Sequence, residues 1–478
     1  MQHAIRAASA VSESSATPSF WSTVREALRG TQQELTSIPI QRAVLLLAVP
    51  MVLEMSMESL FAVVDIFFVS KLGSDAVAAV GLTESMLSLV YALAMGLSAG
   101  ATAIVSRKTG EKDLEGAAAA AGQVIALSVL GAIVLGAAGV TLSSRLLGAM
   151  GASASVVATG SGYTAVMLGG SVTIFLLFVV NAVFRSAGDA AVAMRALWLA
   201  NGLNILLAPC FIFGVGPVPR MGVAGAAVAT TVSRGIGVAY QVSMLKRGRS
   251  RLAIRARHLR PRPKLIVEIF RLSSTASLQV LIETASWLGL VRILSSFGSQ
   301  ALAGYTIAMR VVTFALLPSW GLANAAATLV GQNLGASEPE RAERSVRAIA
   351  RYNILFLGTI GAVFALAPHV VVRLFTHDGE VATYGADCLR IVAVGFVVFA
   401  YGMVMLQAFN GAGDTITPML VNLGSFWFVK IPIAYVLADV LGLGPRGVFF
   451  AITLAYSAQS IVSAVLFRRG RWKTKKVG

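Results

Sequence analysis

The chain has 478 residues, of which 56% are hydrophobic and 13% are charged, and its formal net charge is +17. Soluble domains average about 25% charged residues, so roughly half of the usual solvating surface is missing and a polytopic membrane protein is indicated. The four histidines and two cysteines show neither metal-ligand spacing nor a disulfide framework, which argues against a metal-dependent enzyme.

The first 40 residues are polar and carry charges of both signs, so they lack the apolar stretch and the cleavage site of a signal peptide. Within them, Phe20 to Arg29 has the composition of a short amphipathic helix on the membrane surface, with a mobile tail as the alternative. We therefore expect residues 1–40 to form a cytoplasmic N-terminal segment.

Beyond this segment lie twelve apolar stretches, each long enough to cross ~30 Å of hydrocarbon as a helix. The first six make an N-lobe over residues 41–245 and the second six a C-lobe over 265–467, which predicts an all-α membrane protein with two six-helix lobes. A basic linker, 246–264, joins the lobes, and a basic tail, 468–478, follows them. In chain order the stretches are 43–69, 76–105, 117–142, 156–184, 190–213, 222–245, 265–297, 301–330, 346–372, 381–409, 415–437 and 447–467.

The orientation is predicted by Lys and Arg, which accumulate on the side of the membrane that they need not cross. With the N-terminus inside, 27 of these residues lie in cytoplasmic segments, counting Arg347 and Arg351 at the start of the ninth stretch, and five lie in outer loops. The largest cluster lies in the linker, as is typical of a loop that sets topology and meets lipid rather than nucleic acid. We expect a multi-pass plasma-membrane protein with both termini in the cytoplasm and no nucleic-acid partner.

An internal repeat relates the two halves at a separation of 225 residues. Because six crossings return the chain to its starting side, the halves must share one orientation, related by a pseudo-twofold axis along the membrane normal. Such a molecule has a natural central cleft between its lobes. The repeat aligns Gly73-Ser74 with Gly298-Ser299, Gly96-Leu97 with Gly321-Leu322, Gly110 with Gly335, Phe184 with Phe409, Ala187-Gly188-Asp189 with Ala412-Gly413-Asp414, and Gly222-Val223 with Gly447-Val448.

Three acidic residues, Glu54, Glu58 and Asp65, lie inside the first predicted membrane helix. At 100° per residue, Glu58 and Asp65 lie about 40° and about 20° from Glu54, so the three form one stripe. Each acid costs roughly 2.5 to 3.5 kcal/mol at the centre of a membrane helix, which excludes a stripe that faces lipid. It faces water, a partner or a bound cation, or it forms a structural polar seam between helices.

The seventh helix carries Gln279 and Glu283 one turn apart. The repeat pairs Glu54 with Gln279 and Glu58 with Glu283, whereas Asp65 has no acidic counterpart. If the first helix of each half lines the cleft, both lobes present carboxylates to it.

Neighbouring carboxylates in a low dielectric couple their protonation, as a proton-driven carrier requires. Left ionised beside polar oxygens such as that of Asn204, the same acids would instead hold Na⁺. Lys430, Arg292 and Arg310 also lie inside predicted helices and either pair with these acids or meet an anionic group of the substrate. Asn181, Gln407 and Lys430 are further candidates for lining the cleft.

Three motifs stand in register with the repeat: Val64-Asp65-Ile66-Phe67-Phe68-Val69-Ser70-Lys71-Leu72-Gly73, Gly331-Gln332-Asn333-Leu334-Gly335-Ala336 and Gly411-Ala412-Gly413-Asp414-Thr415. They resemble motifs of the multidrug and toxic compound extrusion (MATE) family. The resemblance, over residues 40 to 468, implies a twelve-helix antiporter that exports organic, often cationic compounds using an H⁺ or Na⁺ gradient.

The resemblance also implies roles for single residues. Asp65 matches the coupling aspartate of the N-lobe, Glu283 matches a cation-binding glutamate of the C-lobe, and Asn204 matches an asparagine beside the N-lobe site. Ala208 and Phe399 stand near positions where many members have an aspartate, so neither lobe's site is complete and Glu54 and Glu58 are candidates for supplying the acidity.

We therefore expect a monomeric antiporter of small organic molecules, surrounded by membrane lipids, with no cofactor. Protons are preferred as the coupling ion, and Na⁺ at Asp65 and Asn204 is the alternative. Another candidate is a lipid-linked oligosaccharide flippase of the same wider superfamily, which would prefer a cationic cleft. An intramembrane enzyme would need a nucleophile and base or a metal motif inside the helices, and the sequence shows none.

Overall fold

The structure is a computed structural model that describes residues 19–31, 33–214, 219–247 and 251–477, without the side chains of Asp65 and Ile66. Residues 1–18 of the predicted N-terminal segment lie outside this part. The first half of the chain comprises α2 (Phe20–Arg29), α3 (Ile40–Ser70), α4 (Ser74–Gly110), α5 (Leu114–Ala149), α6 (Ala154–Gly169), α7 (Ser171–Ser186), α8 (Ala190–Phe213) and α9 (Val223–Lys246).

The linker holds one short helix, η2 (Ala256–Leu259), before the second half begins. That half comprises α10 (Pro263–Leu294), η3 (Ser295–Phe297), α11 (Ser299–Gly335), α12 (Pro339–Leu366), α13 (Pro368–Arg373), α14 (Gly379–Val394), α15 (Phe396–Gly411), α16 (Ile416–Leu423), η4 (Gly424–Lys430), α17 (Ile431–Tyr435), η5 (Val436–Val440), α18 (Pro445–Arg468) and η6 (Arg471–Thr474).

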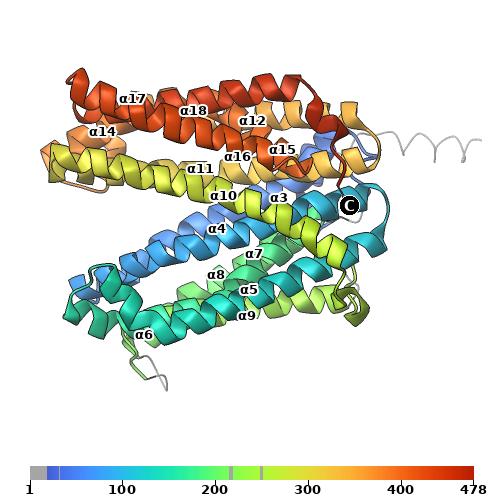
Figure 1. The fold of residues 1–478 in the computed structure, drawn as a ribbon, viewed down its shortest axis with the longest axis horizontal. Helices are drawn as coiled ribbons and strands as arrows, with labels where there is room; N and C mark the ends of the chain where they lie inside the picture. Colours follow the sequence, from blue (N-terminus) through green and yellow to red (C-terminus); the bar gives the residue numbers. More distant parts are fainter. Residues whose placement is uncertain (1–18, 32, 215–218, 248–250, 478) are drawn as a thin grey trace, which may run out of the picture.

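The described helices confirm an all-α membrane protein of two lobes. Ten helical spans are long and apolar enough to cross a membrane, and α14 with α15, bent by 58°, forms an eleventh crossing. The remaining crossing of the first half is α9, which is less apolar because it buries Arg234 and Gln241 against its neighbours. Figure 1 shows the two lobes splayed apart at one end and converging at the end where the C-terminus lies.

Three predicted stretches are interrupted in the structure. The fourth stretch of each half is divided at Gly170 and at Gly395, which the repeat pairs. A Cβ at either glycine would lie close to a threonine methyl, 2.6 Å from Thr231 Cγ2 and 2.9 Å from Thr453 Cγ2, respectively. The ninth stretch ends at Leu366 rather than at residue 372, because the proline that begins α13 disfavours helical backbone at the residue before it.

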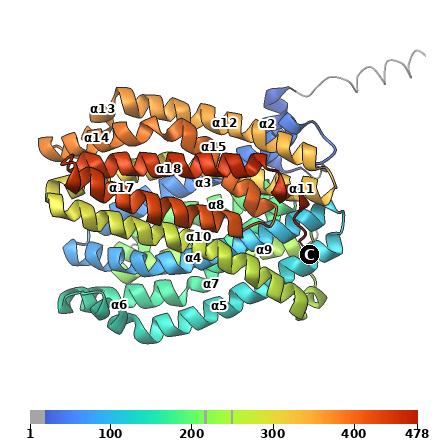
Figure 2. The same cartoon turned by 45° about the horizontal axis from the view of Figure 1, so that its top comes forward.

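The lobes meet where the first helix of each half packs against the second helix of the other. Figure 2 shows one of these pairs, α4 and α10, running side by side. Glycines allow the close approach on both sides of the pseudo-twofold axis. A Cβ at Gly96 would lie 2.0 Å from Ser277 Oγ of α10, and a Cβ at Gly321 would lie 2.6 Å from the carbonyl oxygen of Met51 in α3.

The C-terminal ends of α4 and α11 cross where the lobes converge. A Cβ at Gly110 would lie 2.0 Å from the carbonyl oxygen of Gln332, and one at Gly335 would lie 2.1 Å from that of Arg107. Gln332 Nε2 also donates to the carbonyl oxygen of Ser186 at 2.8 Å. This end of the molecule is therefore closed by direct backbone packing between the lobes.

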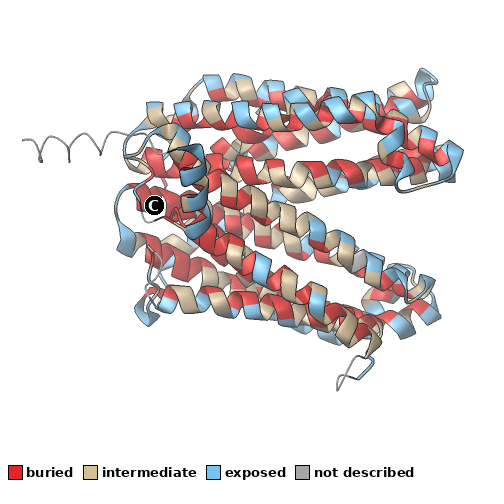
Figure 3. Cartoon of the chain, turned by 180° about the vertical axis from the view of Figure 1, so that it is seen from behind, coloured by how far each residue is buried: buried red, intermediate tan, exposed pale blue. Residues whose placement is uncertain are grey.

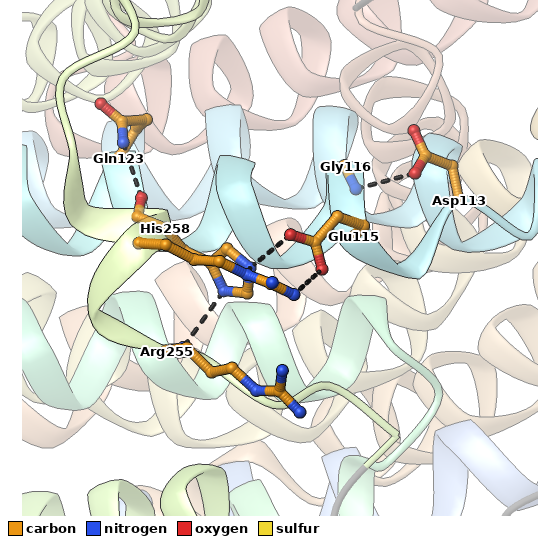
Figure 4. Close-up of polar contacts among 7 residues, drawn as sticks. Asp113, Glu115, Gly116, Gln123, Arg255 and His258 are labelled. Carbon is orange, nitrogen blue, oxygen red and sulfur yellow. Dashed lines mark hydrogen bonds and ion pairs between the residues drawn. The ribbon is translucent and has the colours of Figure 1, made fainter.

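The linker folds back onto the beginning of α5 (Figure 4). His258 is buried, and its Nε2 lies 2.8 Å from Glu115 Oε1, while Arg257 pairs with the other oxygen of the same carboxylate at 2.9 Å. Gln123 Nε2 donates to the carbonyl oxygens of His258 and Arg260. The linker residues around His258 are thus packed against the N-lobe at the closed end.

The C-terminal tail joins both lobes at the same end. Trp472 is fully buried and stacks on Phe467 with ring centroids 4.8 Å apart. Lys473 forms ion pairs with Glu340 and Glu343 of α12. Arg107 of the N-lobe donates to the carbonyl oxygen of Lys475 at 2.5 Å. The tail therefore connects the end of the C-lobe to α4.

Candidate functional site

A cavity of about 310 Å³ lies between the lobes, mostly against the N-lobe; we call it the N-lobe cavity. Helices α3, α4, α7 and α8 supply one wall, and α11 and α15 supply the other. Its lining combines two carboxylates and one guanidinium with aromatic rings, amides and apolar side chains. The residues are Glu54, Met55, Glu58, Tyr91, Met95, Ser98, Ala99, Thr102, Leu177, Phe178, Asn181, Arg185, Leu197, Leu317, Trp320, Asn324, Ala327, Thr328, Gln407 and Asn410.

Glu54 is paired within the N-lobe. Its Oε1 accepts hydrogen bonds from Arg185 Nη1 at 2.8 Å and from Asn181 Nδ2 at 2.9 Å, both on α7. Asn181 Oδ1 in turn accepts from Gln241 of α9 at 2.5 Å. Glu54 is only 1% exposed, and its Oε2 accepts no hydrogen bond from the described residues. Most of its negative charge is therefore balanced by Arg185.

Glu58, one turn further along α3, is the second carboxylate of the N-lobe cavity. Its Oε2 accepts from Asn201 Nδ2 of α8 at 2.9 Å. Within the described part of the chain, no Lys or Arg forms an ion pair with it. Glu58 is thus the carboxylate in this cavity whose charge no protein cation balances by direct contact.

A smaller cavity of about 150 Å³ lies against the C-lobe; we call it the C-lobe cavity. Glu283 of α10 lines it, and Glu283 Oε1 accepts from the hydroxyl of Tyr456 at 2.9 Å. Lys430 lies behind this lining, with its Nζ 4.3 Å from the ring centroid of Phe426 and 5.7 Å from that of Tyr456. The C-lobe site therefore consists of a carboxylate, a phenol and a nearby ammonium group.

The two cavities adjoin, because they share Met95, Ala99, Trp320, Gln407 and Asn410. Gln407 Nε2 donates to Asn324 Oδ1 at 2.9 Å, and Asn410 Nδ2 donates to Gln407 Oε1 at 2.9 Å. These amides form a polar boundary between the carboxylates of the two lobes. A molecule in either cavity would contact this boundary.

The repeat preserves a contact while changing its charge. Glu54 pairs with Arg185 in the N-lobe, and their counterparts 225 positions later, Gln279 and Asn410, form an amide hydrogen bond of 3.1 Å. Arg185 was not among the predicted site residues, although it stands opposite Asn410 in the same register that pairs Glu54 with Gln279.

The remaining predicted residues are distributed over several places. The side chain of Asp65 lies outside the described part of the structure. Asn204 lines neither cavity and donates to Thr230 Oγ1 at 2.8 Å. Phe399 lines the C-lobe cavity. Among the described residues, no cluster of three or more His, Cys, Asp or Glu side chains is arranged to hold a metal ion.

The chain is similar to known transporters over most of its length. The family model MatE matches residues 50–210 and 276–436. The probable multidrug resistance protein NorM of Thermotoga maritima is 27% identical over 92% of this chain and 94% of its own. The multidrug export protein MepA of Staphylococcus aureus is 24% identical over 90% of this chain and 93% of its own. A structure described as the outward-facing conformation of a multidrug resistance MATE family transporter superposes with a TM-score of 0.87, at 27% identity over 93% of this chain and 98% of that one.

Proposed function

The chain belongs to the MatE family of membrane transporters, and on this premise we propose that it exports organic, often cationic compounds in exchange for protons. The observation that carries the substrate class is the composition of the N-lobe cavity. Glu58 supplies a carboxylate without a protein cation, and Tyr91, Phe178 and Trp320 line the same cavity. Carboxylates and aromatic faces both attract organic cations, and the apolar lining suits their hydrocarbon parts.

Alternating access is the proposed mechanism, with the described conformation open away from the basic end. The α4–α11 crossing and the C-terminal tail close the molecule at the end that carries the linker. With that end in the cytoplasm of a plasma-membrane protein, as the Lys and Arg distribution favours, the cavities communicate with the outside. The similarity to a structure described as outward-facing supports this assignment.

Proton coupling is supported by Glu54 and Arg185. A proton that binds to Glu54 Oε2, which lacks a partner among the described residues, removes the charge that balances Arg185. The guanidinium would then repel an organic cation in the same cavity. Drug and proton therefore compete in the N-lobe through charge, as antiport requires. Asp65, on the same stripe of α3, remains our proposed principal coupling residue, with Glu54, Glu58 and Glu283 as further proton sites.

The positions of the cationic side chains argue against an anionic lipid-linked oligosaccharide as the substrate. Among the described residues that line the two cavities, Arg185 is the one with a formal positive charge, and it pairs with Glu54. Arg292 and Arg310 are exposed on their helices and line neither cavity. Pyrophosphate would therefore meet more negative than positive charge.

The test is export from vesicles by wild type and by Asp65→Asn. A pH gradient without Na⁺ and a Na⁺ gradient at equal pH are imposed separately, with a fluorescent organic cation as the substrate. We expect the pH gradient to drive export by wild type and Asp65→Asn to bind the substrate without concentrating it. Asp75→Asn, in the first turn of α4 and outside both cavities, is the matched control and should behave like wild type. Export by Asp65→Asn at the wild-type level under both gradients would refute the role of Asp65, and export driven by Na⁺ alone would refute proton coupling.

A further inference from the structure

A groove of about 690 Å³ lies on the outer side of the C-lobe, away from the transport cavities. It runs between α18 and the neighbouring helix formed by α16 and η4, which lie side by side at one edge of the molecule (Figures 1 and 2). We call it the tail groove, because η6 of the C-terminal tail forms one end. Leu420, Gly424 and Val462 line its length, and Arg469, Arg471 and Lys475 line its end.

The long walls of the tail groove are apolar and face away from the protein. Leu420 of α16 is 55% exposed and Val462 of α18 is 44% exposed. Both lie in helices that are apolar enough to span a membrane. Gly424 and Ser425, where the helix takes up wider π-helical turns, leave the groove wall without bulky side chains. In a bilayer, these surfaces would contact acyl chains.

The end of the tail groove at the closed side of the molecule is basic. Arg469, Arg471 and Lys475 line it, and they face one carboxylate, that of Asp414. Lys475 pairs with Asp414 at 3.3 Å. Within the described part of the chain, neither Arg469 nor Arg471 has an ion-pair partner. Two guanidinium groups therefore remain available beside an apolar groove.

We propose that the tail groove binds an anionic phospholipid, with its phosphate against Arg469 and Arg471 and an acyl chain between Leu420 and Val462. Guanidinium groups bind phosphate through paired N–H donors, and the anionic lipids of the cytoplasmic leaflet attract basic residues at its surface. A free phosphate would use the basic end alone, whereas the apolar walls continue the site into the membrane. The leaflet assignment rests on the proposed orientation.

The lipid has a structural consequence for the closed end. Arg471, Trp472 and Lys475 belong to the tail whose carbonyl oxygen at Lys475 accepts a hydrogen bond from Arg107 of α4. A phospholipid on Arg469 and Arg471 would therefore hold the tail in the position where it joins the two lobes. Binding is expected to stabilise the conformation described here.

The test counts lipids on the purified full-length protein by native mass spectrometry, with phosphatidylglycerol and phosphatidylcholine as probes. Wild type should retain one phosphatidylglycerol per chain and prefer it to phosphatidylcholine by at least about tenfold, which corresponds to ~1.4 kcal/mol. Arg469→Gln with Arg471→Gln removes the basic end, and Val462→Trp fills the apolar part without changing charge. Each of these two variants should lower the affinity for phosphatidylglycerol by about tenfold.

Controls separate the groove from general attraction. Lys246→Gln with Arg247→Gln neutralises two exposed residues at the end of α9 and should leave the bound lipid in place. Inorganic phosphate at millimolar concentration should not displace it. The proposal is overturned if Val462→Trp, eluting as a monodisperse protein, keeps wild-type binding, if the Lys246/Arg247 variant loses as much lipid as the groove variants, or if phosphate competes. Ala458→Trp provides a second filling variant, and none of these measurements depends on transport.

Discussion

Gly110 and Gly335, 225 positions apart, each lack a side chain where the other half's backbone passes. The space beside Gly110 is taken by the carbonyl oxygen of Gln332, and that beside Gly335 by the carbonyl oxygen of Arg107, at 2.0 and 2.1 Å from where a Cβ would lie. Because Arg107 and Gln332 are themselves separated by 225 positions, the crossing of α4 and α11 is symmetric. The closed end therefore depends on two glycines, one from each lobe.

Gly335→Ala should open this end or prevent it from closing. The methyl group would meet backbone, which cannot move aside as a side chain can, so the cost is expected to exceed the ~1–3 kcal/mol typical of overpacking. We expect lower thermal stability and strongly reduced export with normal membrane insertion. The control is Gly81→Ala in α4, where no atom lies within 4 Å of the added carbon. This variant should retain both its thermal stability and its export activity. Equal behaviour of the two variants would contradict the symmetric closure.

Arg185→Asn should destabilise the N-lobe, because it leaves the buried carboxylate of Glu54 without its cation. Removing one partner of a buried ion pair typically costs ~3–5 kcal/mol. Adding Glu54→Gln to that variant recreates the amide pair that Gln279 and Asn410 form in the C-lobe, so stability should largely return. Thermal unfolding of the two single variants and of the double variant gives the coupling energy between Glu54 and Arg185. The double variant should still fail in proton-driven export, whereas full recovery of export would exclude Glu54 from coupling.

Glu58→Gln should weaken binding of organic cations more than that of neutral compounds of the same shape. The substitution keeps a hydrogen-bond acceptor for Asn201 and removes the carboxylate charge that no protein cation balances by direct contact. Loss of a charge-assisted interaction of ~1.5–3 kcal/mol corresponds to a fall in affinity of roughly 10- to 100-fold. Equilibrium binding of a matched cationic and neutral pair of ligands measures the difference. An equal loss for both would show that Glu58 acts through the cavity's shape rather than through its charge.

Asp189, in the turn before α8, should make stability depend on pH. Burial raises the pKa of its carboxyl from 3.8 to about 6, while Arg195 and Arg251 oppose the shift. Because the folded state holds this proton more tightly, the stabilisation is present below pH 4 and is lost as the pH rises through 6. A pKa shift of about two units corresponds to a change of about 3 kcal/mol in the free energy of unfolding.

The comparison is thermal unfolding of wild type and Asp189→Asn between pH 4 and 7. The Asn variant should gain stability relative to wild type as the pH rises, since it keeps the neutral form. Asp75→Asn, at a carboxylate that is only half-buried, is the control. Curves for wild type and Asp189→Asn that stay parallel across this range would contradict the buried-acid account.

The orientation can be tested by labelling single cysteines from outside intact cells, in a variant without Cys210 and Cys388. Cysteines placed at Asp75 and Gly379 should react, because these positions begin α4 and α14 at the open end. A cysteine at Arg257 should react only after the membrane is permeabilised. The reverse pattern would place the linker and both termini outside the cell.

Much of the architecture follows from local and periodic features of the sequence. The apolar stretches predict the membrane helices because uncompensated charge is costly in lipid, and α8 has the predicted bounds, Ala190–Phe213. The repeat predicts two lobes related by a pseudo-twofold axis, which agrees with the reciprocal packing of α3 on α11 and of α4 on α10. The resemblance to the family was recognised from three motifs that stand in register with this repeat.

The partners of the buried charges were decided by the tertiary structure. Helical periodicity places Glu54 and Glu58 on one stripe, but it does not show that α7 brings Arg185 to Glu54 while Glu58 meets only the amide of Asn201. Likewise, the sequence does not show that Asn204, predicted beside the N-lobe site, donates to Thr230. A side chain's direction around its helix follows from spacing along one segment, whereas its partner depends on the rotation and depth of a second helix, which the packing of the whole lobe determines.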